Sequence, residues 1–325
     1  MKRILARAGG VVVLLLGALV LLVQFRQNRT FDAPYPPLAA VDDPAVIERG
    51  RYLVFGPAHC AACHAPGEMV EKLDLEGEPP LSGGFTYPLP FGTLHFPNIT
   101  PDPETGIGRY TDGEVARVLR YGVKPNGQAL LPVMEYQNIS DEDIVAILSY
   151  LRSRPAVRRE VPATALNLMG RVLKAFVFEP VGPSGSPPAV SPPEEATVER
   201  GEYLANRVAQ CAQCHTRRNM GDMSFAGPRF AGGAELNEPF APDYTFVTPN
   251  LTPHPRTGAL AGWTEDRFVE RFRAGRTVEA SPMMWELFQR MSDTDLRAIY
   301  RYLMSLDPVD NETRPYVRPR AADEA

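Results

Sequence analysis

Apolar residues recur at helical spacing in three places of the first half of the chain. Residues 44–55 begin with proline and end before glycine, residues 111–121 open with a Thr-x-x-Glu capping box, and residues 141–152 follow a serine cap. The pattern predicts a compact helical domain in which a first and a last helix flank longer irregular segments.

The same pattern returns in the second half of the chain, residues 197–307. The matched segments are 47–53 with 198–204, 97–101 with 249–253, and 140–151 with 292–303. Because the offset between matched residues is 151 or 152 throughout, the chain is a tandem duplication. We predict two domains, at residues 41–153 and 197–310.

Residues 154–196 join the two predicted domains and divide into two parts. Residues 165–178 are apolar enough for a short amphipathic helix, and residues 180–193 form a spacer rich in proline, glycine and serine. We expect the helix to pack on a domain, with a place at the membrane or against a partner as the alternatives. Residues 311–325 are predicted to be a loose tail.

An uncharged apolar run, residues 8–23, follows Lys2, Arg3 and Arg7. A basic flank with such a run directs export, and the positive flank places the rest of the chain across the membrane. No small-x-small cleavage site follows the run, so we expect residues 1–30 to be an uncleaved signal anchor and not a cleaved signal peptide. The run is short for a membrane span, but it can serve as an upright helix.

Composition agrees with the prediction of two globular domains, and charge limits the class of partner. The chain has 325 residues, of which 44% are hydrophobic, as is ordinary for a globular protein of about two domains. The formal net charge is -5, and residues 31–154 hold 17 acidic against 9 basic side chains. Nothing here resembles the basic footprint of a nucleic-acid-binding protein, so we expect no nucleic-acid partner.

All four cysteines fall in two matched motifs, Cys60-Ala-Ala-Cys63-His64 and Cys211-Ala-Gln-Cys214-His215. Cys-x-x-Cys-His is the attachment signature of c-type haem, because two thiols on one helical turn reach two vinyl groups of a porphyrin while the histidine turns toward iron. A dithiol redox centre would not need the histidine, and one zinc ion held by four cysteines would leave both histidines unexplained. We therefore predict two covalent haem c groups.

Residues 66–108 form a long stretch rich in glycine and proline that follows the first motif. Loops of this length are uncommon in compact domains unless they are functional, and one wrapped around a porphyrin would have a function. Asn98 and Asn250 stand at matched places in the two halves, each followed by x-Thr-Pro. Their side chains are expected either to shape a turn or to donate a hydrogen bond inside the haem pocket.

Each half resembles a class I cytochrome c domain around its Cys-x-x-Cys-His motif. The whole chain is similar to the membrane-anchored cytochrome c subunits of bacterial alcohol and gluconate dehydrogenases, although those usually carry three haem domains and this chain has two. The resemblance covers residues 41–152 and 197–308. It implies an all-α fold of two tandem domains after a transmembrane helix, with the first and last helices of each domain crossing at Gly50 and Gly201.

The resemblance also implies that a methionine ahead of the last helix is the sixth iron ligand. Met134 is the candidate in the first half. In the second half, matching the Met-x-aromatic pattern selects Met283, whereas matching the preceding proline selects Met284, and we expect Met283. The expected iron ligands are His64, Met134, His215 and Met283. Ligation by histidine and methionine leaves no open position at iron and suits electron transfer.

These features predict a membrane-anchored dihaem cytochrome that relays single electrons and has no catalytic residues. Its partners would be a dehydrogenase, an oxidase or a small cytochrome. We expect a single-pass protein of the cytoplasmic membrane with its haem domains in the periplasm. The alternatives are the electron-accepting subunit of a periplasmic dehydrogenase complex and a dihaem peroxidase, which would need one iron with an open or displaceable ligand.

Overall fold

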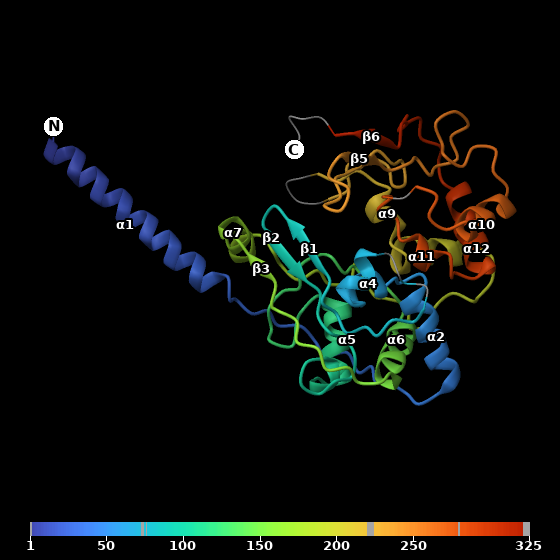
Figure 1. Ribbon diagram of the computed structural model, residues 1–325, viewed down its shortest axis with the longest axis horizontal. Coiled ribbons are helices and arrows are strands. Elements are labelled where there is room, and N and C mark those ends of the chain that lie inside the picture. The colour runs from blue at the N-terminus through green and yellow to red at the C-terminus, as the bar shows by residue number, and fades with distance from the viewer. Residues whose placement is uncertain (1, 73–74, 76, 220–223, 279, 321–325) are drawn as a thin grey trace.

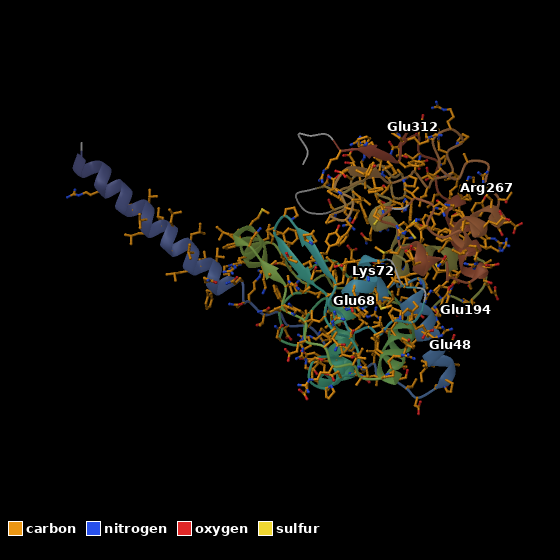
Figure 2. All side chains as sticks on the ribbon, viewed as in Figure 1. Glu48, Glu68, Lys72, Glu194, Arg267 and Glu312 are labelled. Atoms are coloured by element: carbon orange, nitrogen blue, oxygen red, sulfur yellow. The ribbon has the colours of Figure 1, made fainter. Side chains whose placement is uncertain are left out.

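The computed structural model describes residues 2–72, 75, 77–219, 224–278 and 280–320. Helix α1 (Lys2–Arg26) projects away from the rest of the chain (Figure 1). Side chains along most of this helix have no neighbours from the body of the protein (Figure 2). Residues 31–196 form a first half, which lies beside a second half formed by residues 197–320.

The helices of the two halves follow the same order. Those of the first half are α2 (Pro44–Phe55), α3 (Ala61–His64), α4 (Gly67–Glu71), the 3-10 turn η1 (Ile107–Arg109), α5 (Asp112–Tyr121), α6 (Asp141–Ser153) and α7 (Leu168–Phe176). Those of the second half are α8 (Val198–Tyr203), the π-helical turn η2 (Leu204–Val208), α9 (Cys211–Cys214), α10 (Glu265–Arg273), α11 (Trp285–Phe288) and α12 (Asp293–Met304).

The predicted helix starts are confirmed by their caps. Thr111 and Glu114 form both hydrogen bonds of a capping box at the start of α5. The Ser140 hydroxyl accepts a hydrogen bond from the backbone N–H of Asp143 at 3.0 Å, at the start of α6. At the start of α2, Asp43 accepts hydrogen bonds from the backbone of the first turn. Each cap satisfies backbone donors that the helix itself leaves unpaired.

The first and last helices of each half cross at a glycine, as the resemblance implies. α2 packs against α6, and α8 packs against α12. A Cβ atom added to Gly50 would lie 1.9 Å from the carbonyl oxygen of Ala146, and one added to Gly201 would lie 1.9 Å from that of Ala298. A side-chain carbon at that distance would overlap the oxygen, so only glycine lets the two helices approach this closely.

The predicted all-α fold class is wrong, because each half carries a three-stranded antiparallel sheet. The strands are β1 (Thr86–Leu89), β2 (Gly92–His95) and β3 (Ala165–Leu166) in the first sheet, and β4 (Glu235–Leu236), β5 (Tyr244–Val247) and β6 (Val317–Pro319) in the second. In each sheet, two strands from the loop after the motif pair with each other, and the second of them also pairs with a third strand that lies beyond α6 or α12. Strands of two to four residues are too short to produce an alternating pattern, and Pro88 and Gly92 weaken the signal further.

Residues 154–196 follow α6 and lead to the second half. They run back over the first half. Its strand β3 pairs with β2. The predicted amphipathic helix forms as α7, where the Asn167 side chain accepts a hydrogen bond from the N–H of Gly170 at 3.0 Å. Strand β6 lies within the predicted tail and pairs with β5, while residues 321–325 are outside the described part of the chain. The domain boundaries given above stay a prediction.

The helix crossing gives a prediction in which two glycine-to-alanine changes have opposite signs. Gly50→Ala should lower the free energy of unfolding by about 1–3 kcal/mol or more, because the new methyl group meets a backbone oxygen that cannot move aside. Gly113→Ala, on α5, should leave it unchanged or raise it by up to about 1 kcal/mol, because the nearest atom to its Cβ would lie 3.5 Å away. Denaturant unfolding of both variants checks this. Equal stability of the two variants would contradict the crossing.

Candidate functional site

The first Cys-x-x-Cys-His motif forms one tight turn on the wall of a cavity. Helix α3 carries Cys63 and His64, and Cys60 is its N-cap. These three residues line a cavity of about 630 Å³ together with Met134, a volume in the usual range of about 300–1,000 Å³ for a site that encloses a small molecule or cofactor. The structure therefore brings all four predicted site residues of the first half to one cavity.

The histidine of each motif has its Nδ1 atom next to a backbone carbonyl. Nδ1 of His64 lies 2.8 Å from the Pro97 oxygen, and Nδ1 of His215 lies 3.2 Å from the Pro249 oxygen. If Nδ1–H donates to that carbonyl, the lone pair on Nε2 is free to bind a metal, as in most histidine-ligated sites. Burial lowers the pKa of both imidazoles, which favours the neutral form that ligates iron.

The thiols are suited to a covalent attachment and not to thiolate chemistry. Burial raises the pKa of Cys60, Cys63 and Cys211 to about 12 in the chain as described. A catalytic dithiol needs a lowered thiol pKa. Among the residues that the structure describes, which include all four cysteines, no group of three or more His, Cys, Asp or Glu side chains is placed to hold a metal ion.

The loop that carries Met134 is tied down on both sides. The hydroxyl of Tyr136 donates a hydrogen bond to the carbonyl of Ala58, just before the first motif. On the other side, Glu135 accepts a hydrogen bond from Gln213, which lies inside the second motif, and forms an ion pair with Arg218 at 3.3 Å. These contacts hold the half-buried methionine against the cavity.

In the second half, Met283 and Met284 are both half-buried against the apolar core. The aromatic residues that follow the two candidate methionines, Tyr136 and Trp285, are 6% and 8% exposed. This matched burial favours the alignment of Met134 with Met283. Met291 is 1% exposed, as is Ile139 at the matched position, so Met291 is a residue of the apolar core.

The matched asparagines shape turns, which was one of the two interpretations of the sequence. Asn98 accepts hydrogen bonds from the backbone N–H and the hydroxyl of Thr100, at 2.9 and 2.7 Å. Its side-chain amide donates to the carbonyl of Val157, in the segment after the last helix, at 2.7 Å. Asn250 makes the equivalent contacts with Thr252 and Val309. Each asparagine thereby ties the long loop to the chain that follows the last helix.

Besides the contacts of Glu135, the two halves meet through a tyrosine, a glutamate and two phenylalanines near the motifs. Sequence patterns did not single out these residues. The Tyr87 hydroxyl donates a hydrogen bond to a carboxylate oxygen of Glu238 at 3.1 Å, and the Phe85 ring lies 5.7 Å from the Phe240 ring. Burial, and then the charge of Glu238, raises the pKa of Tyr87, and the thiols of Cys214 and Cys63 act in the same direction. The Tyr87 hydroxyl thus lies in the electrostatic reach of both motifs.

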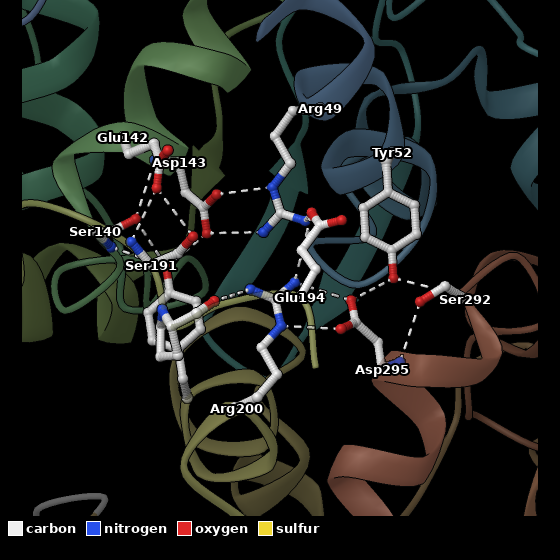
Figure 3. A network of polar contacts seen from close by, with 12 residues as sticks. Arg49, Tyr52, Ser140, Glu142, Asp143, Ser191, Glu194, Arg200, Ser292 and Asp295 are labelled. Carbon is white, nitrogen blue, oxygen red and sulfur yellow. Dashed lines mark hydrogen bonds and ion pairs between the residues drawn. The ribbon is translucent and has the colours of Figure 1, made fainter. Parts of the chain in front are cut away.

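Two matched ion pairs lie where the halves meet (Figure 3). Arg49 binds Asp143 within the first half at 3.0 and 3.3 Å, and Arg200 binds Asp295 within the second half at 2.9 and 3.1 Å. The linker residue Glu194 accepts a hydrogen bond from Arg49 at 2.9 Å and lies 4.0 Å from Arg200. Figure 2 labels Glu194 at this junction.

A tyrosine of each half completes the ion pair of the other half (Figure 3). The Tyr203 hydroxyl donates to Asp143 at 2.6 Å, and the Tyr52 hydroxyl donates to Asp295 at 2.6 Å. Each hydroxyl also accepts from the backbone N–H of the partner helix's serine cap, Ser140 at 2.9 Å and Ser292 at 3.2 Å. The contact therefore has approximate two-fold symmetry.

Two motif turns, each with an imidazole next to a backbone carbonyl and a methionine loop ahead of the last helix, are the features of a c-type cytochrome. No family model matches the chain. The chain is 34% identical over 283 residues to the cytochrome c subunit of the quinone-type alcohol dehydrogenase of Gluconobacter oxydans, a match that covers 82% of this chain and 56% of the relative.

Two further relatives carry similar names. The gluconate 2-dehydrogenase cytochrome c subunit of Pantoea cypripedii is 30% identical, over 82% of this chain and 60% of its own. The diheme cytochrome c-type protein of Cereibacter sphaeroides is 30% identical, over 79% of this chain and 85% of its own. The chain thus spans little more than half the length of the dehydrogenase subunits but most of the smaller protein. It belongs to the family of c-type cytochromes that includes the latter protein.

The interface gives a prediction about stability and pH. Burial, and then the charge of the partner aspartate, raises the pKa of Tyr52 and Tyr203 above the value of about 10 that tyrosine has in an unfolded chain. Groups with a raised pKa stabilise the fold fully below pH 10, and this contribution is lost as the pH rises above about 10 toward the folded pKa. The free energy of unfolding should therefore fall as the pH rises above that value.

Tyr52→Phe and Tyr203→Phe should each cost about 1–3 kcal/mol at neutral pH, because each leaves a buried carboxylate short of a hydrogen bond. The double variant should also lose much of the alkaline decline. Tyr244, which is 45% exposed on β5, offers a matched Tyr→Phe control with little effect. Denaturant titrations between pH 7 and 11 measure both effects, and an unchanged alkaline decline in the double variant would count against the interface.

Proposed function

We propose that this chain carries two covalent haem c groups and relays single electrons through them. The observation that carries the proposal is that Cys60, Cys63, His64 and Met134 line one cavity, while Cys211, Cys214 and His215 repeat the motif in the second half. Bound haem c supplies an iron centre that accepts and releases one electron.

The residues of the chain have separate roles in this proposal. Cys60, Cys63, Cys211 and Cys214 would form the thioether bonds that hold the two haem groups, and His64 and His215 would each bind one iron. Met134 and Met283 would supply the second ligand of each iron. The carbonyls of Pro97 and Pro249 orient the two imidazoles, and the apolar lining keeps water from iron. No catalytic residue is proposed.

Contacts between the halves support electron transfer inside the chain. Glu135 links the Met134 loop to Gln213 in the second motif, and the Tyr87–Glu238 pair lies within the electrostatic reach of Cys63 and Cys214. Both contacts link a segment near one proposed haem site to a segment near the other. We propose that the electron passes between the two sites within the chain.

The proposed organisation is an anchor at residues 1–30 and two cytochrome domains at residues 41–153 and 197–310. Of the described residues, those of α1 include one segment long and apolar enough to cross a membrane, Gly9–Arg26, with mean hydropathy 2.2. We place the chain as a single-pass protein in the cytoplasmic membrane with both domains in the periplasm, where c-type haem is attached. The positive flank at Lys2, Arg3 and Arg7 supports this orientation.

A dehydrogenase is the partner that the relatives favour. Two of those described above are named as cytochrome c subunits of alcohol and gluconate dehydrogenases. We propose that the chain accepts electrons from a dehydrogenase of this kind, either as a subunit of its complex or after transient docking. The excess of acidic side chains in residues 31–154 would steer a partner with a basic docking surface toward the first haem.

Carbon monoxide binding tests the proposed ligands and the carrier function together. In the reduced native protein it should bind slowly or not at all, because a methionine sulfur occupies the sixth position of each iron. Met134→Ala and Met283→Ala should each open one iron to prompt binding, measured by stopped-flow spectroscopy. Met284→Ala is the matched control and should behave as the native protein.

The outcomes separate the alternatives. If Met284→Ala opens an iron and Met283→Ala does not, then Met284 is the second ligand. Prompt binding of carbon monoxide to one haem of the native protein, together with turnover of hydrogen peroxide, would contradict the carrier function and favour a dihaem peroxidase.

A further inference from the structure

We propose that α7 lies in the surface of the membrane, with Leu168, Val172 and Phe176 among the lipid headgroups. This inference deepens the proposed function and rests on the proposed membrane span of α1. It gives the chain a second contact with the bilayer, one that would set the orientation of the first half above the membrane.

Helix α7 exposes its large apolar side chains, whereas a helix of a soluble protein buries them. Its large apolar side chains face outward: Leu168 is 72% exposed, Val172 39% and Phe176 40%. These three residues follow one another at intervals of four, so they form one stripe along the helix. Met169, at 48%, widens this stripe. A soluble helix turns such a stripe toward its own core.

Two small residues mark where α7 packs against the rest of the chain. Gly170 lies so close to β2 that an added Cβ would be 2.1 Å from the carbonyl oxygen of Phe91. Ala175 is completely buried. The helix thus packs on the first half, as the sequence predicted. Its exposed apolar stripe marks a surface for contact with lipid or with a partner protein.

The position of α7 relative to α1 identifies lipid as that contact. α7 lies beside the C-terminal end of α1, on the side from which α1 projects (Figure 1). Arg26 donates a hydrogen bond to the carbonyl of Ala175 at 3.3 Å, and its guanidinium lies 5.1 Å from the centre of the Phe176 ring. Arg29 donates to the carbonyl of Phe178 at 2.9 Å. The last turn of α1 is therefore fixed against α7.

The length of α1 places this junction at the boundary of the bilayer. Its apolar window, Gly9–Arg26, has 18 residues and so is about 27 Å long at 1.5 Å per residue, close to the hydrocarbon thickness of about 30 Å. If this window spans the hydrocarbon, Arg26 and α7 lie at the level of the headgroups.

The charges around the stripe fit a headgroup layer. Arg171 is exposed on α7, and Arg26 and Arg29 lie at its edge, while Glu179 is a neighbouring acid and pairs with Arg29 at 3.3 Å. Lys174 instead turns toward the protein and donates a hydrogen bond to Gln128 at 3.0 Å. Helices that lie in the interface combine an apolar stripe with lysine and arginine side chains that reach the lipid phosphates.

Photo-crosslinking of the full-length holoprotein in vesicles tests the inference. The vesicles contain phosphatidylcholine and phosphatidylglycerol with a small share of lipid that carries a diazirine near the headgroup end of one acyl chain. After illumination, mass spectrometry of the digested protein should find lipid adducts on α1 and on α7. The peptide that contains Val190, an apolar residue 66% exposed beside the start of α6, should stay free of adducts.

Substitutions make the test specific to the stripe. The double variant Leu168→Asp, Val172→Asp should lose the adducts on α7 and keep those on α1, because charged side chains do not enter the acyl boundary. Val190→Asp is the matched control and should leave both sets of adducts unchanged.

Each outcome bears on one of the two proposals. Adducts on α1 without adducts on α7 in the native chain would overturn the inference and leave the membrane span standing, with a partner protein as the remaining occupant of the stripe. Absence of adducts on both helices would overturn the membrane span and the inference together. Adducts on α7 that survive in the double variant would show contact without a role for the stripe and would also overturn the inference.

Discussion

The arrangement of this protein depends on how two buried carboxylates are satisfied where its halves meet. Asp143 and Asp295 are almost completely buried, and a charge removed from water is costly unless it is paired and hydrogen-bonded. Each aspartate binds an arginine of its own half and a tyrosine of the other half. Because neither carboxylate is complete within one half, the polar groups are satisfied only when both halves adopt this relative position.

This contact determines the relative position of the two halves more than it adds to the free energy of unfolding. A buried ion pair often adds little net stability compared with apolar residues of the same volume, whereas removal of one partner costs about 3–5 kcal/mol. The matched pairs therefore act against alternative arrangements of the halves. They lie at the starts of α6 and α12, whose other residues support the crossing glycines, so the same helices position both the interface and the walls of the candidate haem sites.

Local chemistry made much of this site predictable. The Cys-x-x-Cys-His motifs, the helix caps and the crossing glycines each depend on a few residues with a fixed spacing, and the structure confirms the caps and the crossings. Met134 was predicted from its place ahead of the last helix, and it lines the cavity with His64. The duplication also made the matched pairs Arg49 with Arg200 and Tyr52 with Tyr203 visible in the sequence.

Long-range pairing was the part that sequence patterns could not reveal. The two small sheets each join the long loop to a segment about 70 residues further along the same half, as in the pairing of β2 with β3, and such short strands leave no periodic signal. The hydroxyls of Tyr52 and Tyr203 bind across the interface, a role that the sequence patterns did not indicate. Glu135 and Gln213 match no motif themselves and only stand next to predicted site residues, Met134 and Cys214. The strands of each sheet come from one half, but the partners of these side chains come from the other half, and a pattern within one half does not name them.

The central claim is that one chain holds two covalent haem groups at its two motifs. Intact-mass spectrometry of the denatured native protein tests it most directly, with the double variants Cys60→Ala, Cys63→Ala and Cys211→Ala, Cys214→Ala for comparison. The account predicts a mass increase equal to two haem groups in the native chain and one in each variant. A native mass with one haem or none, or a variant that keeps two, would contradict it.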